Sequence, residues 1–233
     1  MTAKIQTIRA GSNCFLLRAS DGFVLVDSGV ASRRAAAEKS LASAGCRPGD
    51  LKLVVLTHGD SDHADNCAYL RRVYGATIGM HPADVQMVER GDMSLGRKAR
   101  PDRITTMGRV IGLMGKLMSL LGSPSFERFS PDILFEDGQS LSSYGLDAAI
   151  VGLPGHSKGS IGVLTSDGDL FCGDLIYNFF KPNMVWIDDM PDGNASISRL
   201  ATINVRTVYP GHGKPFPWAE FATKLVRGLT TSR

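Results

Sequence analysis

Two imidazoles and two carboxylates follow a short apolar run in the first third of this 233-residue chain. The run, residues 53–56, is rich in Leu and Val, as is typical of a buried parallel strand. His58, Asp60, Asp62 and His63 come directly after it. Imidazole and carboxylate groups bind zinc, iron and manganese, and a tight loop can direct all four groups at one or two points. The cluster by itself fits either a divalent-metal site or a polar turn followed by an Asp helix cap.

Further polar groups stand at the ends of other apolar runs. Asp27 and Asp174 follow such runs directly, and His156 and His212 lie in glycine-containing turns after them. Open α/β sheets place their functional sites at the carboxyl ends of strands. These four positions and the cluster of His58 to His63 therefore predict a shared site. His81, the fifth histidine of the chain, lacks this setting, and we expect it to have a capping or surface role.

These motifs resemble those of the metallo-β-lactamase superfamily over nearly the whole chain. The resemblance rests on Val-Asp-Ser-Gly around Asp27, the six residues from His58 to His63, Pro-Gly-His-Ser around His156, Gly-Asp at Asp174 and Pro-Gly-His-Gly around His212. The second motif of the family usually reads His-x-His-x-Asp-His, and Asp60 stands here at its second histidine. Asp65 stands where the family commonly has glycine; it is compatible with a helix cap but could also tilt the loop.

The resemblance implies a site for two divalent metal ions. The implied ligands are His58, Asp60 and His156 for the first ion, Asp62, His63 and His212 for the second, and Asp174 for both. Asp174 would bridge the ions together with a water or hydroxide, and Asp27 would anchor the ligand loop. The resemblance favours zinc as the metal. An oxygen ligand at Asp60 makes the first site harder and lowers its charge by one, which shifts preference towards manganese or iron.

The same resemblance implies how the chain holds these residues. We expect an α/β fold, an αββα sandwich of two mixed β-sheets flanked by helices, with the metals at one edge between the sheets. Short strand-like runs that alternate with helix-like segments agree with this arrangement. The length suits one large α/β domain or two small ones, and we expect a single domain over residues 1–233.

Residues 86–131 are expected to form a helical insertion in this domain. Apolar side chains fall on one helical face over residues 107–121, glycines interrupt that helix, and Arg97 is one of several basic residues beside it. Two interpretations stay open: a helical pair packed on the domain, or a mobile lid over the metals with an adaptable Met-rich face. In the second, Met114 and Met118 are candidates for substrate binding.

Composition limits the function classes and the compartment. Hydrophobic residues make up 43% of the chain and charged residues 21%, as in a typical globular protein, and the net charge of +3 does not indicate nucleic-acid binding. No apolar run reaches the roughly 18 residues of a membrane span, and the first residues lack the apolar core of a signal peptide. The four cysteines form no Cys-x-x-Cys pair, which favours buried thiols in a reducing compartment. We expect a cytoplasmic enzyme with a small-molecule substrate and neither nucleic-acid nor membrane partners.

A dinuclear site of this kind predicts hydrolysis. A metal-bound hydroxide attacks, one ion stabilises the developing oxyanion, and the other takes the leaving group. Asp62 is the candidate catalytic residue, because it can orient the nucleophile or carry its proton as well as bind metal. The substrates expected are a lactone, a thioester or a related ester. A β-lactam also fits, since function resides in the site rather than in the fold.

Two other functions remain open. A carboxylate in place of the second imidazole also resembles the di-iron oxidoreductases of the same superfamily, although those use glutamate and carry a flavodoxin-like domain for which this sequence shows no pattern. A non-catalytic metal-binding module is the third alternative. Metal analysis separates the first two, because iron with a visible absorption favours redox chemistry and zinc favours hydrolysis.

Overall fold

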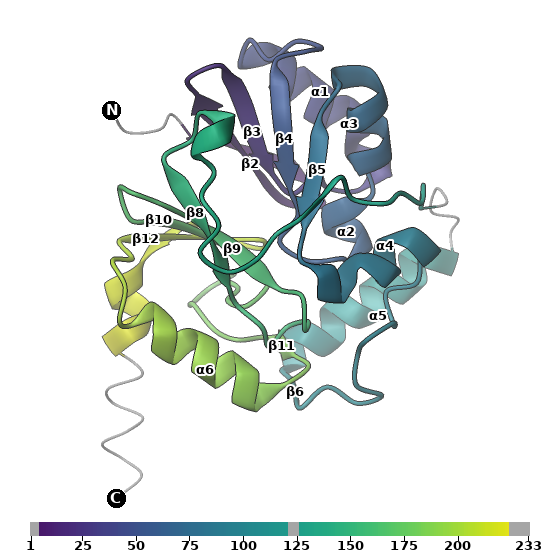
Figure 1. The fold of residues 1–233 in the computed structure, drawn as a ribbon. Coiled ribbons are helices and arrows are strands. Elements are labelled where there is room, and N and C mark those ends of the chain that lie inside the picture. Colours follow the sequence, from purple (N-terminus) through teal and green to yellow (C-terminus); the bar gives the residue numbers. More distant parts are fainter. Residues whose placement is uncertain (1–4, 121–125, 224–233) are drawn as a thin grey trace, which may run out of the picture.

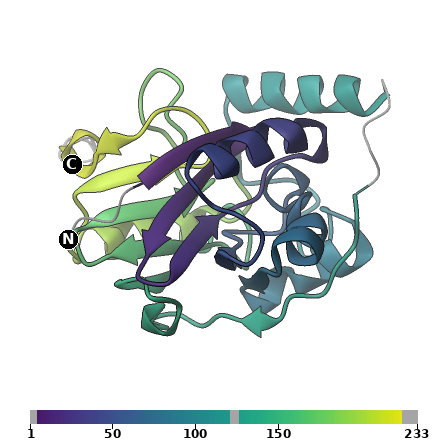
Figure 2. The same cartoon turned by 90° about the horizontal axis from the view of Figure 1, so that it is seen from above.

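Two β-sheets stacked face to face, with helices on their outer sides, form the body of the molecule (Figure 1). The computed structural model describes residues 5–120 and 126–223, and the side chains of all of these except residues 111, 114–116 and 118–120. Seen from above in Figure 2, the yellow and green strands of one sheet lie beside the purple strands of the other. This layering confirms the predicted α/β sandwich.

The first sheet has six strands in the order β1-β2-β3-β4-β5-β7. They are β1 (Ile5–Ala10), β2 (Ser12–Ala19), β3 (Gly22–Val26), β4 (Leu51–Val55), β5 (Thr77–Met80) and β7 (Ile133–Leu134). The first three strands pair antiparallel, whereas β3, β4, β5 and β7 pair parallel. Parallel strands end at the same edge of the sheet, and Asp27 and the loop of His58 follow β3 and β4 there.

The second sheet has five strands in the order β13-β12-β10-β9-β8. They are β8 (Ala148–Gly152), β9 (Ile161–Thr165), β10 (Asp169–Gly173), β12 (Thr207–Pro210) and β13 (Phe216–Pro217). Only β10 and β12 pair parallel, so Asp174 and His212 follow neighbouring strands at the same edge. A separate two-stranded ribbon consists of β6 (Arg103–Ile104) and β11 (Trp186–Ile187).

Helices cover the outer faces of both sheets (Figure 1). They are α1 (Arg34–Ser43), α2 (Ser61–Ala64), α3 (Cys67–Tyr74), α4 (Val85–Arg90), α5 (Thr106–Leu120) and α6 (Met190–Leu200), with short 3-10 turns η1 (Ala31–Arg33), η2 (Pro82–Asp84) and η3 (Ser142–Tyr144). Side chains of α1, α3 and α4 pack on the first sheet, and those of α6 pack on the second. Among the described residues, none of the helices has the length and apolar character needed to span a membrane.

Alternation along the strands divides the core into layers. In β2, Leu16 packs towards the helices of the first sheet, whereas Phe15 and Leu17 lie between the two sheets. This follows from the two-residue period of a strand, in which neighbouring side chains point to opposite faces. The ring of Phe15 lies 5.0 Å from that of Phe171 in β10, measured between centroids, and so joins the sheets. The buried interface gives the loops at its edge a rigid support.

The segment between α2 and α3 shows what Asp65 does. Its Oδ2 accepts a hydrogen bond of 2.8 Å from the backbone N–H of Ala31, and the amide of Asn66 donates to the carbonyls of Ser28 and Val30. These contacts connect the end of the His58 loop to the segment that follows β3. Asp65 therefore has a capping role, as the sequence suggests, but for the 3-10 turn η1 of a different loop.

The expected insertion contains all of α4 except its first residue, the strand β6 and the helix α5. The glycine side of α5 faces the core: a Cβ on Gly112 would lie 3.1 Å from the Trp186 ring, and one on Gly108 would lie 3.2 Å from a backbone carbonyl. The glycines therefore let the helix lie close to β11. Leu113 and Leu117 on α5 are 69% and 58% exposed, so these two described side chains of the apolar face are open to solvent. The side chains of the candidate substrate contacts Met114 and Met118 lie outside the described residues.

Candidate metal centre

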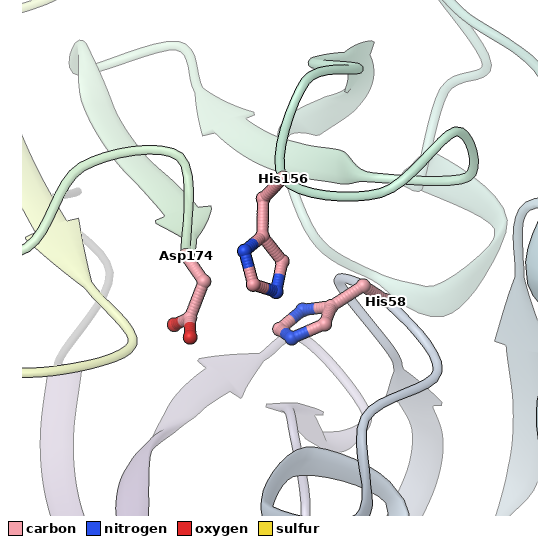
Figure 3. Close-up of side chains that lie close together, drawn as sticks. All are labelled: His58, His156 and Asp174. Atoms are coloured by element: carbon pink, nitrogen blue, oxygen red, sulfur yellow. The ribbon is translucent and has the colours of Figure 1, made fainter. Parts of the chain in front are cut away.

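Loops from both sheets bring the predicted site residues to one edge of the sandwich. Figure 3 shows His58 after β4, His156 after β8 and Asp174 after β10 pointing towards a common point. One ligand atom from each of these three residues lies within 4.8 Å of the other two. A second group with the same closeness consists of Asp62, His63 and His212. The resemblance implies seven ligands, and the structure brings six of them together in these two sets. Asp60, the seventh, lies beside the first set.

The imidazoles of the first set are held by their outer nitrogens. His156 Nδ1 donates to the carbonyl of Trp186 at 2.9 Å, and His58 Nδ1 lies 2.9 Å from the hydroxyl of Thr57. In each ring the other nitrogen, Nε2, is left to face the centre of the site. A partner on the outer nitrogen is how metal-binding histidines are commonly oriented.

In the second set, His63 is held in the same way. His63 Nδ1 lies 2.8 Å from a carboxylate oxygen of Asp27, which leaves its Nε2 to face Asp174 and Asp62. His212 Nε2 lies 3.0 Å from Asp62 Oδ2, and the ring of Tyr177 stacks on the His212 ring with a centroid distance of 5.3 Å. The two sets are adjacent, because the rings of His58 and His63 are 4.1 Å apart between centroids.

Asp174 lies between the two sets. It belongs to the group with His58 and His156, yet its Oδ1 is 3.3 Å from His63 Nε2 and its Oδ2 is 3.5 Å from His212 Nε2. The hydroxyl of Tyr177 donates to Oδ2 at 2.5 Å and fixes the carboxylate. This position is the one that a bridging ligand requires.

Three buried polar atoms test whether the site fits metal ions. His58 Nε2, His63 Nε2 and Asp174 Oδ1 make no hydrogen bond within the described part of the chain, although each is shielded from water. All three face the same centre and are zinc-binding atom types, so divalent ions would satisfy them together.

The charges of the site also favour cations. Burial alone would raise the pKa of Asp174, but His212 and His63 outweigh it and hold that pKa well below its usual range. Burial lowers the pKa of His58, and the neighbouring His63 lowers it further, so this ring is neutral and can bind a metal ion. Burial would lower the pKa values of His63 and His212, but Asp174 and the other nearby carboxylates outweigh it and raise both, that of His212 to about 10. Metal ions would therefore have to displace a proton from each of these two rings, whereas the carboxylates and His58 are already in the protonation state that metal binding requires.

Asp27 supports the ligand loop from outside. Its Oδ1 accepts a hydrogen bond of 2.8 Å from the N–H of Thr57, and its Oδ2 contacts the Thr57 hydroxyl and His63 Nδ1. Among the described residues, Asp27 alone has a positive φ without being glycine, at 61°. That region of backbone conformation is uncommon for other residues but accessible to Asp and Asn. The chain accepts this local strain where it orients His63.

Asp60 contacts both the first set and an arginine that the sequence analysis did not place in the site. Its Oδ2 lies 3.0 Å from His156 Nε2 and 3.5 Å from His58 Nε2. Its Oδ1 accepts a hydrogen bond of 2.5 Å from Arg97 Nη2. A carboxylate in place of a neutral imidazole was a signal that a nearby cation would be needed. Several basic residues flank α5, and their pattern does not single out Arg97.

Asp84 was also missed, because its position after a proline is typical of a helix start. It is buried, and its carboxylate accepts hydrogen bonds from Gly59 N, Ser157 Oγ and Gly159 N at 3.2, 2.6 and 2.9 Å. It therefore joins the His58 loop to the His156 loop. His81, just before it, accepts a hydrogen bond from the N–H of Ala83 at the start of η2, which is the capping role expected for it.

Comparisons with known proteins show what the chain is similar to. The sequence model described as the metallo-beta-lactamase superfamily matches residues 8–212, a span that includes every candidate ligand. The acyl-coenzyme A thioesterase MBLAC2 of Bos taurus is 25% identical over 224 residues, which cover 88% of this chain and 74% of that protein. The probable metallo-hydrolase YflN of Bacillus subtilis is 26% identical over 231 residues, covering 88% of this chain and 80% of the relative.

The fold has close counterparts among solved structures. The metallo-beta-lactamase family protein TTHA1429 from Thermus thermophilus superimposes with a TM-score of 0.70 and 21% sequence identity. The match covers 98% of this chain and 79% of that one. At this level of identity the likeness concerns the fold, and the chemistry must be argued from the site.

Proposed function

The chain belongs to the metallo-β-lactamase superfamily, and from that premise we propose that it hydrolyses an ester-type bond with two divalent metal ions. The observation that carries the proposal is the pair of ligand sets on either side of Asp174, with His58 Nε2, His63 Nε2 and Asp174 Oδ1 all buried and without a hydrogen bond. Relatives described as a thioesterase and as a metallo-hydrolase support hydrolysis as the reaction class.

The residues divide between the ions as follows. The first ion would be held by His58, Asp60 and His156, the second by Asp62, His63 and His212, with Asp174 between them. Zinc suits these imidazole-rich sets, and manganese or iron are the alternatives at the first. When bound, two such ions lower the pKa of a shared water and polarise a carbonyl oxygen.

The chain's own residues supply orientation. Asp62 is 36% exposed and lies 3.0 Å from His212, so its carboxylate can accept a hydrogen bond from the attacking water and hold that water against the substrate. Tyr177 fixes Asp174 through the hydrogen bond from its hydroxyl. The ring of Phe179 lies 6.2 Å from the His212 ring, between centroids, and offers an apolar contact for an acyl group.

Substrate class and compartment are parts of the same proposal. A thioester is the first substrate to test, because the Bos taurus relative is described as an acyl-coenzyme A thioesterase; a lactone is the second. The apolar face of α5 is a candidate for contact with the acyl chain, with Met114 and Met118 as its proposed contact residues. The four cysteines are free and buried, which supports a reducing compartment such as the cytoplasm.

Metal counting and a substrate panel test the proposal together. Mass spectrometry of the zinc-loaded protein should give two ions per chain, and a panel of thioesters, lactones, phosphodiesters and β-lactams should show turnover of an ester. His58→Ala should weaken mainly the first site and His212→Ala mainly the second, while His81→Ala serves as a matched control outside both sets. One ion per fully loaded chain, or bound iron with redox activity and no ester hydrolysis, would contradict the proposal.

A further inference from the structure

The guanidinium of Arg97 reaches into the metal centre from the insertion. Its Nη2 donates to Asp60 Oδ1 at 2.5 Å, and its Nη1 donates to the backbone carbonyl of His156. The side chain is only 12% exposed, although it begins on a surface segment between α4 and β6. Arg97 therefore contacts one residue from the second motif and one from the third.

The two oxygens of Asp60 have different partners. Oδ2 faces the imidazoles of His156 and His58 at 3.0 and 3.5 Å, whereas Oδ1 faces Arg97. A carboxylate can bind a metal with one oxygen and an arginine with the other, because each oxygen has lone pairs of its own.

We propose that Asp60 and Arg97 together replace the second histidine of the family as a single neutral ligand unit, with Asp60 Oδ2 on the first metal ion and Arg97 cancelling the carboxylate charge. This inference rests on the dinuclear site proposed above. It changes the expectation from the sequence, in which Asp60 lowers the charge of the first site by one. Arg97 restores that charge, so the Asp60–Arg97 ion pair adds no net charge to the first site, just as a neutral imidazole adds none.

The surroundings of Arg97 hold it in this place. The N–H of the next residue, Lys98, donates to Asp188 Oδ2 at 2.9 Å, and the N–H of Asp188 donates to the carbonyl of Gly155 at 2.8 Å. The Lys98 ammonium pairs with Asp102 and Asp189 at 2.9 and 2.8 Å. The segment is thus attached, directly after the arginine, to residues that contact the His156 loop.

These contacts argue against another role for Arg97, as an anchor for an anionic substrate. One terminal nitrogen is engaged by a carboxylate and the other by a carbonyl, and little of the side chain reaches solvent. An arginine that waits for a substrate carboxylate would present free N–H groups to the cleft. Arg97 is therefore a positioning residue, and it acts through Asp60.

Four proteins test the proposal by zinc titration against a competing chelator: the wild type, Asp60→His, Arg97→Gln and the double variant. Asp60→His leaves a buried guanidinium without its carboxylate beside a cation, so the affinity of the first site should fall by at least about tenfold, or about 1.4 kcal/mol. Adding Arg97→Gln removes that charge and should restore the affinity to within about threefold of wild type. Arg100→Gln, an exposed arginine of the same segment, is the matched control and should change nothing.

The titrations can contradict the ligand unit and the dinuclear site separately. If Asp60→His binds zinc as tightly as the wild type, or if Arg97→Gln fails to restore the affinity of a folded Asp60→His protein, the ion pair is not a ligand unit. Binding of fewer than two ions by the wild type would instead refute the dinuclear site itself.

The Arg97→Gln variant also gives a readout that does not depend on Asp60→His folding. Without the guanidinium, Asp60 becomes an uncompensated anionic oxygen ligand, and the first site should become harder. Its affinity for Mn²⁺ relative to Zn²⁺ should rise by at least about threefold over wild type, with two ions still bound. An unchanged ratio in a folded Arg97→Gln protein would overturn the proposed charge compensation.

Discussion

Asp84 Oδ2 accepts a hydrogen bond of 2.6 Å from the hydroxyl of Ser157, and this contact joins two loops that are far apart in the sequence. The same carboxylate receives the backbone N–H groups of Gly59 and Gly159. Gly159 approaches so closely that a Cβ on it would lie 2.5 Å from the Asp84 carboxyl carbon. The spacing between His58 and His156 therefore depends on a residue that is absent from every metal motif.

The first prediction concerns this carboxylate. Asp84→Ala removes an acceptor from two backbone N–H groups and one hydroxyl, all of them buried. We expect the free energy of unfolding, measured in urea on the metal-free protein, to fall by about 3 kcal/mol. Zinc affinity of the first site should fall as well, because its two histidines lose their common support. Asp147→Ala, an exposed aspartate between η3 and β8, is the control; equal stability of the two variants would refute the role of Asp84.

The second prediction concerns Asp27. Asn can adopt its φ of 61° and can still accept from Thr57 N, so Asp27→Asn should fold. An amide nitrogen facing His63 Nδ1 would, however, favour the tautomer whose proton lies on Nε2, the atom that faces the metal centre. We expect zinc affinity of the second site to fall by about 10–100-fold, while the first site changes little. A second site of unchanged affinity would show that Asp27 does not set the tautomer.

The third prediction concerns the thiols. Burial raises the pKa of Cys46 to about 11 and the pKa values of Cys67 and Cys172 to about 12, and all four cysteines are buried. At pH 8 the folded protein should therefore react with less than about one equivalent of a thiol reagent, and the denatured protein with four. Rapid modification of Cys172 in the folded protein would show that the metal centre is open to solvent from that side.

The same pKa values predict how stability depends on pH. The pKa values of these thiols are raised in the folded chain, so the folded state binds their protons more tightly than the unfolded state does. Their contribution is complete below the ordinary thiol pKa of about 8.5 and is lost as pH rises through and above it. Urea unfolding of the wild type should show falling stability from about pH 8.5 to 10. Cys67→Ala, which lacks one raised thiol, should show a shallower fall.

The ligand positions were predictable from sequence because each follows a buried strand. Such strands are read from short apolar runs, and their order in the sheet brings His58, His156 and His212 to one edge whatever the intervening loops contain. Arg97 and Asp84 could not be found in this way. They act through contacts with residues about 25 to 75 positions away, and each lies where a simpler local explanation existed, a basic surface segment or a helix start. Such polar cross-links depend on tertiary distances that no local pattern encodes.

Helix α5 shows a second limit of prediction from sequence. Its apolar spacing predicts a helix, and the structure has one, but spacing alone does not tell which face is covered. The glycines form the packed side, because Gly112 permits contact with Trp186, while Val110, Leu113 and Leu117 are exposed. Whether this exposed face acts as a lid over the substrate stays a prediction.

The last prediction tests that face. Leu113 is 69% exposed, so Leu113→Lys should change the free energy of unfolding by less than about 0.5 kcal/mol and leave zinc content unchanged. If the face covers an acyl chain, the charge should raise KM for long-chain thioesters several-fold, with little effect on short-chain ones, because only the long chain loses an apolar contact. Leu134→Lys, at an exposed leucine of β7, is the matched control. Equal KM values for the two variants across chain lengths would refute the lid, and strong hydrogen-exchange protection of α5, equal to that of β4, would do so independently.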